Sequence, residues 1–101
     1  MKEDLEKIIN HYGVMPQLKY FQSEVFELNE AIIEHKVIED SGLFRSSDES
    51  EARQHIIEEF ADVMVMLEQF KAHYNLDNDN IIKTMKFKIA RQLERMNNEN
   101  K

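Results

Sequence analysis

Two pairs of carboxylate side chains have a spacing that suits a divalent metal ion. Glu24 and Glu27 are three residues apart, and so are Glu59 and Asp62. In a helix, residues three apart lie on one face, with side chains about 5–6 Å from each other. Mg²⁺ prefers such oxygen ligands, keeps several waters and completes its coordination with substrate phosphates. The four residues are therefore candidate metal ligands, with Mg²⁺ the expected ion and Mn²⁺ an acceptable substitute.

The same spacing also arises by chance, because the chain has twenty acidic residues. Glu3/Glu6 and Glu27/Glu30 have similar spacing, and exposed acidic pairs are usually only solvated. The position of each pair relative to the apolar residues is more informative. In both predicted helices the pair lies on the same flank of the apolar stripe. If the two stripes pack antiparallel, as in a helical hairpin, four carboxylates converge at the edge of the core.

The elements that position these pairs are two long helices. The first is predicted from Pro16 to about residue 36, with apolar residues three or four apart: Leu18, Phe21, Val25, Leu28 and Ile32. The second is predicted from about Asp48 to Tyr74. Its apolar stripe consists of Ile56, Phe60, Val63, Leu67, Phe70 and Tyr74. Asp48 and Glu51 have the spacing of a capping box at its start.

A short helix over residues 2–11 precedes this pair, and Gly13 ends it. Residues 37–47 read as a loop, and 75–79 as a turn rich in helix-capping residues. A last helix carries Ile82, Met85, Ile89, Leu93 and Met96, and the tail 97–101 is expected to fray. The sequence therefore predicts an all-α fold, a helical bundle of about four helices with a central antiparallel hairpin. Residues 1–101 form one domain.

The composition narrows the range of functions. Thirteen basic against twenty acidic residues give a net charge of −7, which disfavours a DNA-binding protein because that task needs a basic surface. The absence of cysteine excludes disulfides and thiolate metal sites. No apolar run approaches the roughly 20 residues of a membrane helix, and the N-terminus does not resemble a signal peptide. We expect a cytoplasmic location and no membrane partner.

Histidine-based chemistry finds little support. Ferritin-like di-iron sites need Glu-x-x-His motifs, and none of the four histidines has Glu three residues before it. Each histidine is therefore interpreted as a solvated helix residue.

A basic face on the last helix is a candidate phosphate-binding surface. Lys88 and Arg91 lie beside the apolar stripe of that helix, with Arg95 nearer its end. Cations there could pair with phosphate oxygens, or could be a solvated face favoured by the helix dipole. Met66 lies beside Glu59 and could pack in the core or against a nucleobase. An aromatic ring of His11, Tyr12 or Tyr20 could stack on a base.

The order of these motifs resembles the MazG-like all-α nucleoside triphosphate pyrophosphohydrolases. The resemblance covers about residues 8–96 and is carried by SEVFEL (23–28), EEFADV (58–63) and FKIARQLER (87–95). It implies that Glu24, Glu27, Glu59 and Asp62 hold Mg²⁺ while water attacks a (deoxy)nucleoside triphosphate between its α and β phosphates. The products are a nucleoside monophosphate and pyrophosphate. It also implies a homodimer or homotetramer with sites at subunit interfaces.

The chain departs from the family pattern at one notable position. Ser23 stands where the family usually has the first Glu of EExxE. The alternative function is therefore a catalytically degenerate helical oligomer that acts as a non-enzymatic interaction module. Hydrolysis of another nucleotide, such as phosphoribosyl-ATP, is a third interpretation. The preferred base and sugar, the general base and the biological role stay open.

Overall fold

The computed structural model describes residues 1–42 and 46–99, with the side chains of 46 and 47 excepted. Within these ranges all the regular secondary structure is helical. The elements are α1 (Lys2–Tyr12), α2 (Val14–Ser41), α3 (Ser46–His73) and α4 (Asn78–Glu99). The all-α prediction and the order of the helices are confirmed. No helix in the described part of the chain is long and apolar enough to cross a membrane.

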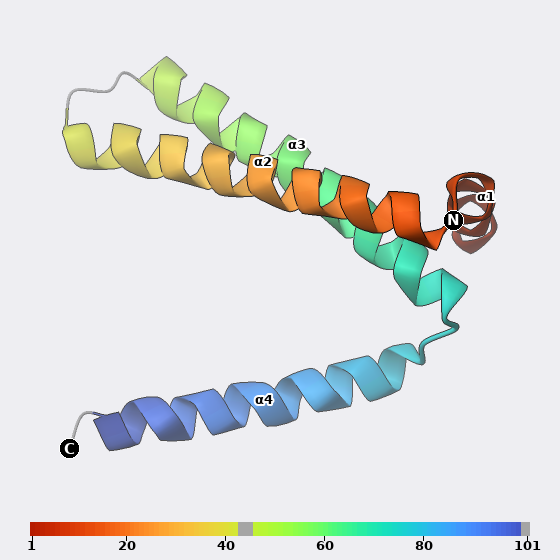
Figure 1. Cartoon of the computed structure of the whole chain (residues 1–101). Helices are drawn as coiled ribbons and strands as arrows, with labels where there is room; N and C mark the ends of the chain where they lie inside the picture. The colour runs from red at the N-terminus through yellow and green to blue at the C-terminus, as the bar shows by residue number, and fades with distance from the viewer. Residues whose placement is uncertain (43–45, 100–101) are drawn as a thin grey trace.

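Helices α2 and α3 form an antiparallel hairpin, and α1 packs at its open end against both (Figure 1). Layers of side chains hold the hairpin together along its length. At the open end the Gln17 amide donates to Gln69, 2.8 Å away, and the Phe21 and Phe70 rings meet edge to face. Near the opposite end, Ala31 is fully buried, which allows the two backbones to approach closely.

Glycines separate the first helices, as predicted. Gly13 ends α1 with φ 93°, a conformation that side-chain-bearing residues rarely adopt, and its N–H donates to the Ile9 carbonyl. Pro16 then falls in the first turn of α2, where a missing N–H costs nothing. Gly42 closes α2 in the left-handed conformation. At the start of α4, the Asn80 N–H donates to Asp77, which caps the helix from the predicted turn.

Several predicted boundaries were wrong. Helix α2 continues to Ser41 through much of the predicted loop 37–47, of which residues 43–45 lie outside the described part. Helix α3 begins at Ser46, so Asp48 is its third residue and not its cap. The last helix extends to Glu99, through most of the tail that was expected to fray. The additional helical residues, 37–41, 46–47 and 97–99, are mostly weak helix formers such as Ser, Asn and Asp, so helix propensity does not predict them.

The face that α2 presents to α3 also differs from the prediction. The buried residues of α2 are Gln17, Glu24 and Ala31, whereas Leu18 and Ile32 of the predicted stripe are 38% and 46% exposed. Helix α3 behaves alike, with Met66 and Gln69 buried while Phe60 and Leu67 of the predicted stripe are exposed. Both helices are rotated by about 80° toward the acidic flank, at 100° per residue. The acidic flank of each helix, which was predicted to lie at the edge of the core, therefore lies in the interface between α2 and α3.

Helix α4 packs against none of the other described helices (Figure 1). Its apolar stripe is exposed, from Ile82, 43% exposed, to Leu93, 59% exposed. The radius of gyration is 17.7 Å, against about 13 Å for a compact domain of this size. One chain therefore forms a bundle of α1, α2 and α3 only, and the predicted packing of the fourth helix is not found within it.

Candidate functional site

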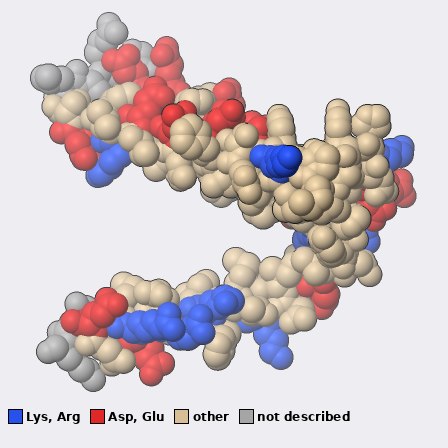
Figure 2. Space-filling model, viewed as in Figure 1, with Lys and Arg blue, Asp and Glu red and all other residues tan. Residues whose placement is uncertain are grey.

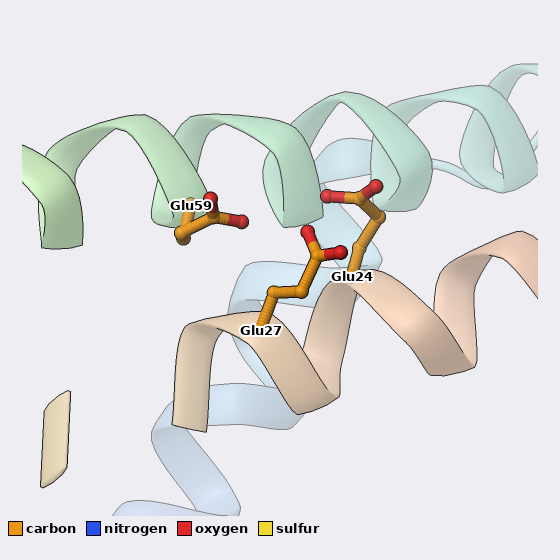
Figure 3. A group of neighbouring side chains, drawn as sticks. All are labelled: Glu24, Glu27 and Glu59. Atoms are coloured by element: carbon orange, nitrogen blue, oxygen red, sulfur yellow. The ribbon is translucent and has the colours of Figure 1, made fainter. Parts of the chain in front are cut away.

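Three of the four predicted carboxylates meet between α2 and α3. Glu24, Glu27 and Glu59 each offer an oxygen, and these oxygens lie within 4.8 Å of one another. Figure 3 shows Glu24 and Glu27 pointing from α2 toward α3, and Glu59 pointing back toward α2. Glu24 is 5% exposed, Glu59 is partly buried and Glu27 is at the surface. The spacing of three on α2 and the antiparallel hairpin together produce this convergence.

Two of these carboxylates are incompletely satisfied. Among the described residues, Oε2 of Glu24 and Oε2 of Glu59 are buried and have no hydrogen-bond partner. A buried polar atom without a partner is costly, and more so when it carries charge. The arrangement has the chemistry of a cation site, because oxygen ligands that repel one another become favourable when a cation lies between them.

The electrostatics of the cluster follow from this crowding. Burial raises the pKa of the Glu24 carboxyl; a hydrogen bond with the Tyr20 hydroxyl opposes the rise, and neighbouring carboxylates led by Glu27 add to it. Burial also raises the pKa of Glu59, and the charge of Glu27 and a hydrogen bond with it raise it further. In turn, the hydrogen bond to Glu24 raises the pKa of the Tyr20 hydroxyl. The cluster therefore resists holding all its negative charges without a counter-ion.

Asp62, the fourth predicted ligand, lies at the side of the cluster. It is exposed and outside the group of converging oxygens, but its charge contributes to the raised pKa of both Glu24 and Glu59. Asp62 also lines a neighbouring pocket. It therefore joins the carboxylate cluster to that pocket.

The pocket lies where α1, α2 and α3 meet and has a volume of about 520 Å³. Its lining is mostly apolar and comprises Ile8, Tyr12, Pro16, Gln17, Tyr20, Asp62, Val65, Met66 and Gln69. Met66 is 2% exposed and accepts a contact from the Gln69 amide at its sulfur. Of the two interpretations of Met66 made from the sequence, core packing describes its position, and contact with a nucleobase stays a prediction.

The predicted phosphate-binding residues lie away from the carboxylates of the same chain. Lys88 and Arg91 are exposed on α4, which packs on none of the other described helices and is joined to α3 at its first residue, where Lys71 donates a hydrogen bond to Asn78. Figure 2 shows Lys and Arg side chains along α4, and acidic side chains concentrated on the hairpin toward the α2–α3 connection. The Arg91 guanidinium lies 5.9 Å from the centre of the Phe87 ring, an interaction within α4.

Sequence reasoning missed two histidines that take part in interactions. His35 is mostly buried, and its Nε2 lies 2.9 Å from Glu49 across the hairpin, so its interpretation as a solvated residue was wrong. His55 is half exposed, with Nε2 3.4 Å from Glu59 and Nδ1 3.6 Å from Glu34. The spacing of four between His55 and Glu59 was a usable signal for the second contact.

Comparisons of the chain with protein families, with curated proteins and with solved structures find no match. The MazG-like resemblance therefore stays a prediction, supported by its motifs alone.

Proposed function

We propose that this protein is a divalent-metal-dependent pyrophosphohydrolase of (deoxy)nucleoside triphosphates. The observation that carries the proposal is the pair of buried, unpartnered oxygens of Glu24 and Glu59 beside Glu27. A site that only stabilised the fold would not gather repelling carboxylates in a helix interface. Mg²⁺ suits these oxygens, would neutralise their charge and would leave positions for phosphate oxygens. Cytosolic nucleotides are the expected substrate pool.

The chain's own residues divide the work. Glu24, Glu27 and Glu59 hold the metal, and Asp62 is placed to complete the set or to orient water beside it. The metal supplies polarisation of the phosphoryl oxygens and orientation of the attacking water. Water would break the bond between the α and β phosphates, which gives the nucleoside monophosphate and pyrophosphate and releases the proton of the attacking water to solvent. The hydroxyl of Tyr20 keeps the Glu24 carboxylate in position through their hydrogen bond.

We further propose that the active protein is a homo-oligomer in which Lys88 and Arg91 serve the carboxylates of a neighbouring chain. Helix α4 cannot reach the cluster of its own chain as it stands, and its exposed apolar stripe needs a partner surface. The exposed Phe60 and Leu67 on α3 offer such a surface. Beside the carboxylates of the neighbouring chain, Lys88 and Arg91 would pair with phosphate oxygens and offset charge that develops during the reaction.

Pyrophosphate release from a panel of NTPs and dNTPs, with Mg²⁺ and with EDTA, tests the reaction. We expect metal-dependent release that Glu59→Gln lowers by roughly 100-fold or more. Glu30→Gln is the matched control, because Glu30 is an exposed glutamate on α2 outside the cluster. Release that survives EDTA, or equal loss in both variants, would contradict the proposal.

Mixing two inactive variants tests the shared site. Glu59→Gln lacks a metal ligand, and Lys88→Ala/Arg91→Ala lacks the cations. If the two sets come from different chains, each mixed dimer regains one of its two sites, and because about half of randomly assembled dimers are mixed, the co-expressed protein gives about a quarter of the wild-type rate. If they act within one chain, the mixture stays as inactive as its parents.

The second candidate function is a non-enzymatic interaction module built on the same oligomer. The exposed apolar stripe of α4 favours it, together with Ser23 in place of the family's first Glu. An intact oligomer that binds Mg²⁺ but hydrolyses no nucleotide would support this function over the enzyme.

A further inference from the structure

The pocket between α1, α2 and α3 lies at the open end of the hairpin, and Asp62 lines it beside the carboxylate cluster. Its volume of about 520 Å³ lies within the roughly 300–1,000 Å³ of small-molecule sites. It is mostly apolar, and the buried polar residues in its lining are two glutamines. Gln17 is 8% and Gln69 2% exposed, and their side chains hydrogen-bond to each other.

A buried amide pair is an unusual way to fill a helix interface. Apolar residues of similar length would pack there without the cost of desolvating two amides. Both glutamines line the mostly apolar pocket, and a few placed polar groups in an apolar pocket are what give a ligand site its specificity. An amide offers both a donor and an acceptor, so it suits a ligand edge that has both.

Two aromatic side chains stand at the mouth of the pocket. Tyr12 is 60% and Tyr20 56% exposed, and both line the cavity. Exposed aromatic rings beside an apolar cavity favour a flat, stacking ligand. A planar heterocycle would cover them and bring its edge toward the amides.

The pocket adjoins the carboxylate cluster. Asp62 lines it, and Tyr20 interacts with Glu24. A molecule whose phosphates lie at the carboxylates therefore has the pocket beside it for its other end.

We infer that this pocket holds the nucleobase of the substrate and that the Gln17–Gln69 amide pair reads the base's hydrogen-bonding edge. The inference rests on the proposed function, since that places a nucleoside triphosphate at the neighbouring carboxylates. The tyrosines supply affinity for any base, and the amides discriminate among bases. Gln17 and Gln69 are thus specificity-determining residues, while the carboxylates carry the reaction.

A binding experiment separates this inference from the reaction. The side-chain amide resonances of Gln17 and Gln69 are followed by ¹⁵N NMR in EDTA, assigned through Gln17→Met and Gln69→Met. Nucleoside 5′-monophosphates are the probes, and ribose 5-phosphate is the probe without a base. We expect both amides to shift with at least one nucleotide and to stay unmoved with ribose 5-phosphate. No shift with any nucleotide, or equal shifts with the sugar phosphate, would overturn the inference.

Substrate ranking provides the second measurement. In Gln17→Met/Gln69→Met, the ratio of kcat/KM between the best and the worst base should fall by roughly tenfold or more, while hydrolysis itself persists. Gln22→Met is the control, since Gln22 is exposed on the same helix. An unchanged ranking overturns the inference and leaves the reaction standing. Base-dependent amide shifts without any hydrolysis would instead retain the base site and reject the proposed reaction.

One competing occupant is a side chain of a second copy. In that case the amide resonances would shift with protein concentration alone and ignore nucleotides. That result would overturn the inference, and an assigned intermolecular contact would identify the occupant.

Discussion

Glu24 on α2 and Glu59 on α3 lie on either side of Glu27 in the interface of the hairpin, each with one buried oxygen that has no partner among the described residues. Two oxygens of this pair lie within 4.8 Å of each other. Repulsion at this distance in a partly buried interface opposes packing of α2 on α3. A cation between the two carboxylates would relieve this repulsion. Removing either charge should therefore stabilise the fold without metal and weaken its stabilisation by metal.

Glu24→Gln tests this opposition. In EDTA the variant should be more stable than the wild type, with Tm raised by about 3–6 °C, because the amide removes a buried like charge at nearly constant shape. In Mg²⁺ the wild type should gain stability by binding, and the variant should gain little. Thermal unfolding followed by circular dichroism measures both effects.

Glu30→Gln again provides the control, since it removes one charge from the same helix without touching the cluster. It should leave the Mg²⁺-induced rise in Tm intact. A Glu24→Gln variant that is less stable than wild type in EDTA would show that the carboxylate stabilises the metal-free fold.

The pH dependence of stability follows from the same residues. Glu24 and Glu59 have pKa values raised from 4.5 in the folded chain, so the metal-free folded protein binds protons more tightly than the unfolded chain. Their contribution to stability is full below pH 4.5 and is lost as the pH rises through the raised pKa values. Urea unfolding in EDTA should show a declining free energy of unfolding over that window, and a shallower decline in Glu24→Gln.

With Mg²⁺ present the slope should reverse. Protons compete with the metal for the same oxygens, so Mg²⁺ affinity should fall as the pH drops through the raised pKa values. Isothermal titration calorimetry at several pH values measures the affinity directly. A Mg²⁺ affinity that does not change with pH would mean that Glu24 and Glu59 are not the metal ligands.

The helix order could be predicted from the sequence, but the packing face could not. Gly13 marked one boundary, and apolar spacing identified the helices. On α2, the apolar residues that pack against α3 and those that stay exposed follow the same periodic pattern. Leu18 and Ile32 therefore looked like core residues, although both are exposed. The true interface contains Gln17 and Gln69, whose pairing depends on a register that one helix alone does not encode.

The carboxylate cluster was predictable for a related reason. Spacing on each helix fixed Glu24 with Glu27, and an antiparallel hairpin was enough to bring Glu59 to them. The pocket was not predictable, because it needs α1 to pack against the open end of the hairpin, and Tyr12 lies on that helix. The position of Lys88 and Arg91 relative to the carboxylates depends on where α4 packs. Because α4 packs on no other described helix of its own chain, the sequence of one chain does not fix that position.

The buried amide pair makes a prediction about stability. Gln17→Met alone leaves the Gln69 amide without its partner and should cost about 1–3 kcal/mol, whereas Gln17→Met/Gln69→Met should cost less than the sum of the single variants. A double-mutant cycle by urea unfolding measures the coupling. Additive effects would mean that the hydrogen bond contributes nothing in solution.

The packing of α2 on α3 at Ala31 makes another prediction about stability. Ala31 is fully buried, so Ala31→Leu should force the helices apart and destabilise the protein by about 1–3 kcal/mol. The neighbouring Ile32→Leu is the control, because Ile32 is 46% exposed and the swap keeps its volume. If Ile32→Leu were the more damaging change, the helix face predicted from the sequence would be the packed one.

Helix α4 provides the last test, because none of the other described helices packs along it. A helix of 22 residues without tertiary packing is only marginally stable in water. Its exposed apolar stripe should therefore be covered by another chain, and Leu93→Asp should uncover it. We expect the variant to show a lower mass by light scattering, a weaker helical signal by circular dichroism and no hydrolysis. Glu94→Gln changes an adjacent exposed residue outside the stripe and should alter none of these properties. A Leu93→Asp protein that keeps wild-type mass would show that α4 is not the oligomer contact, and the site shared between chains would then need another source of cations.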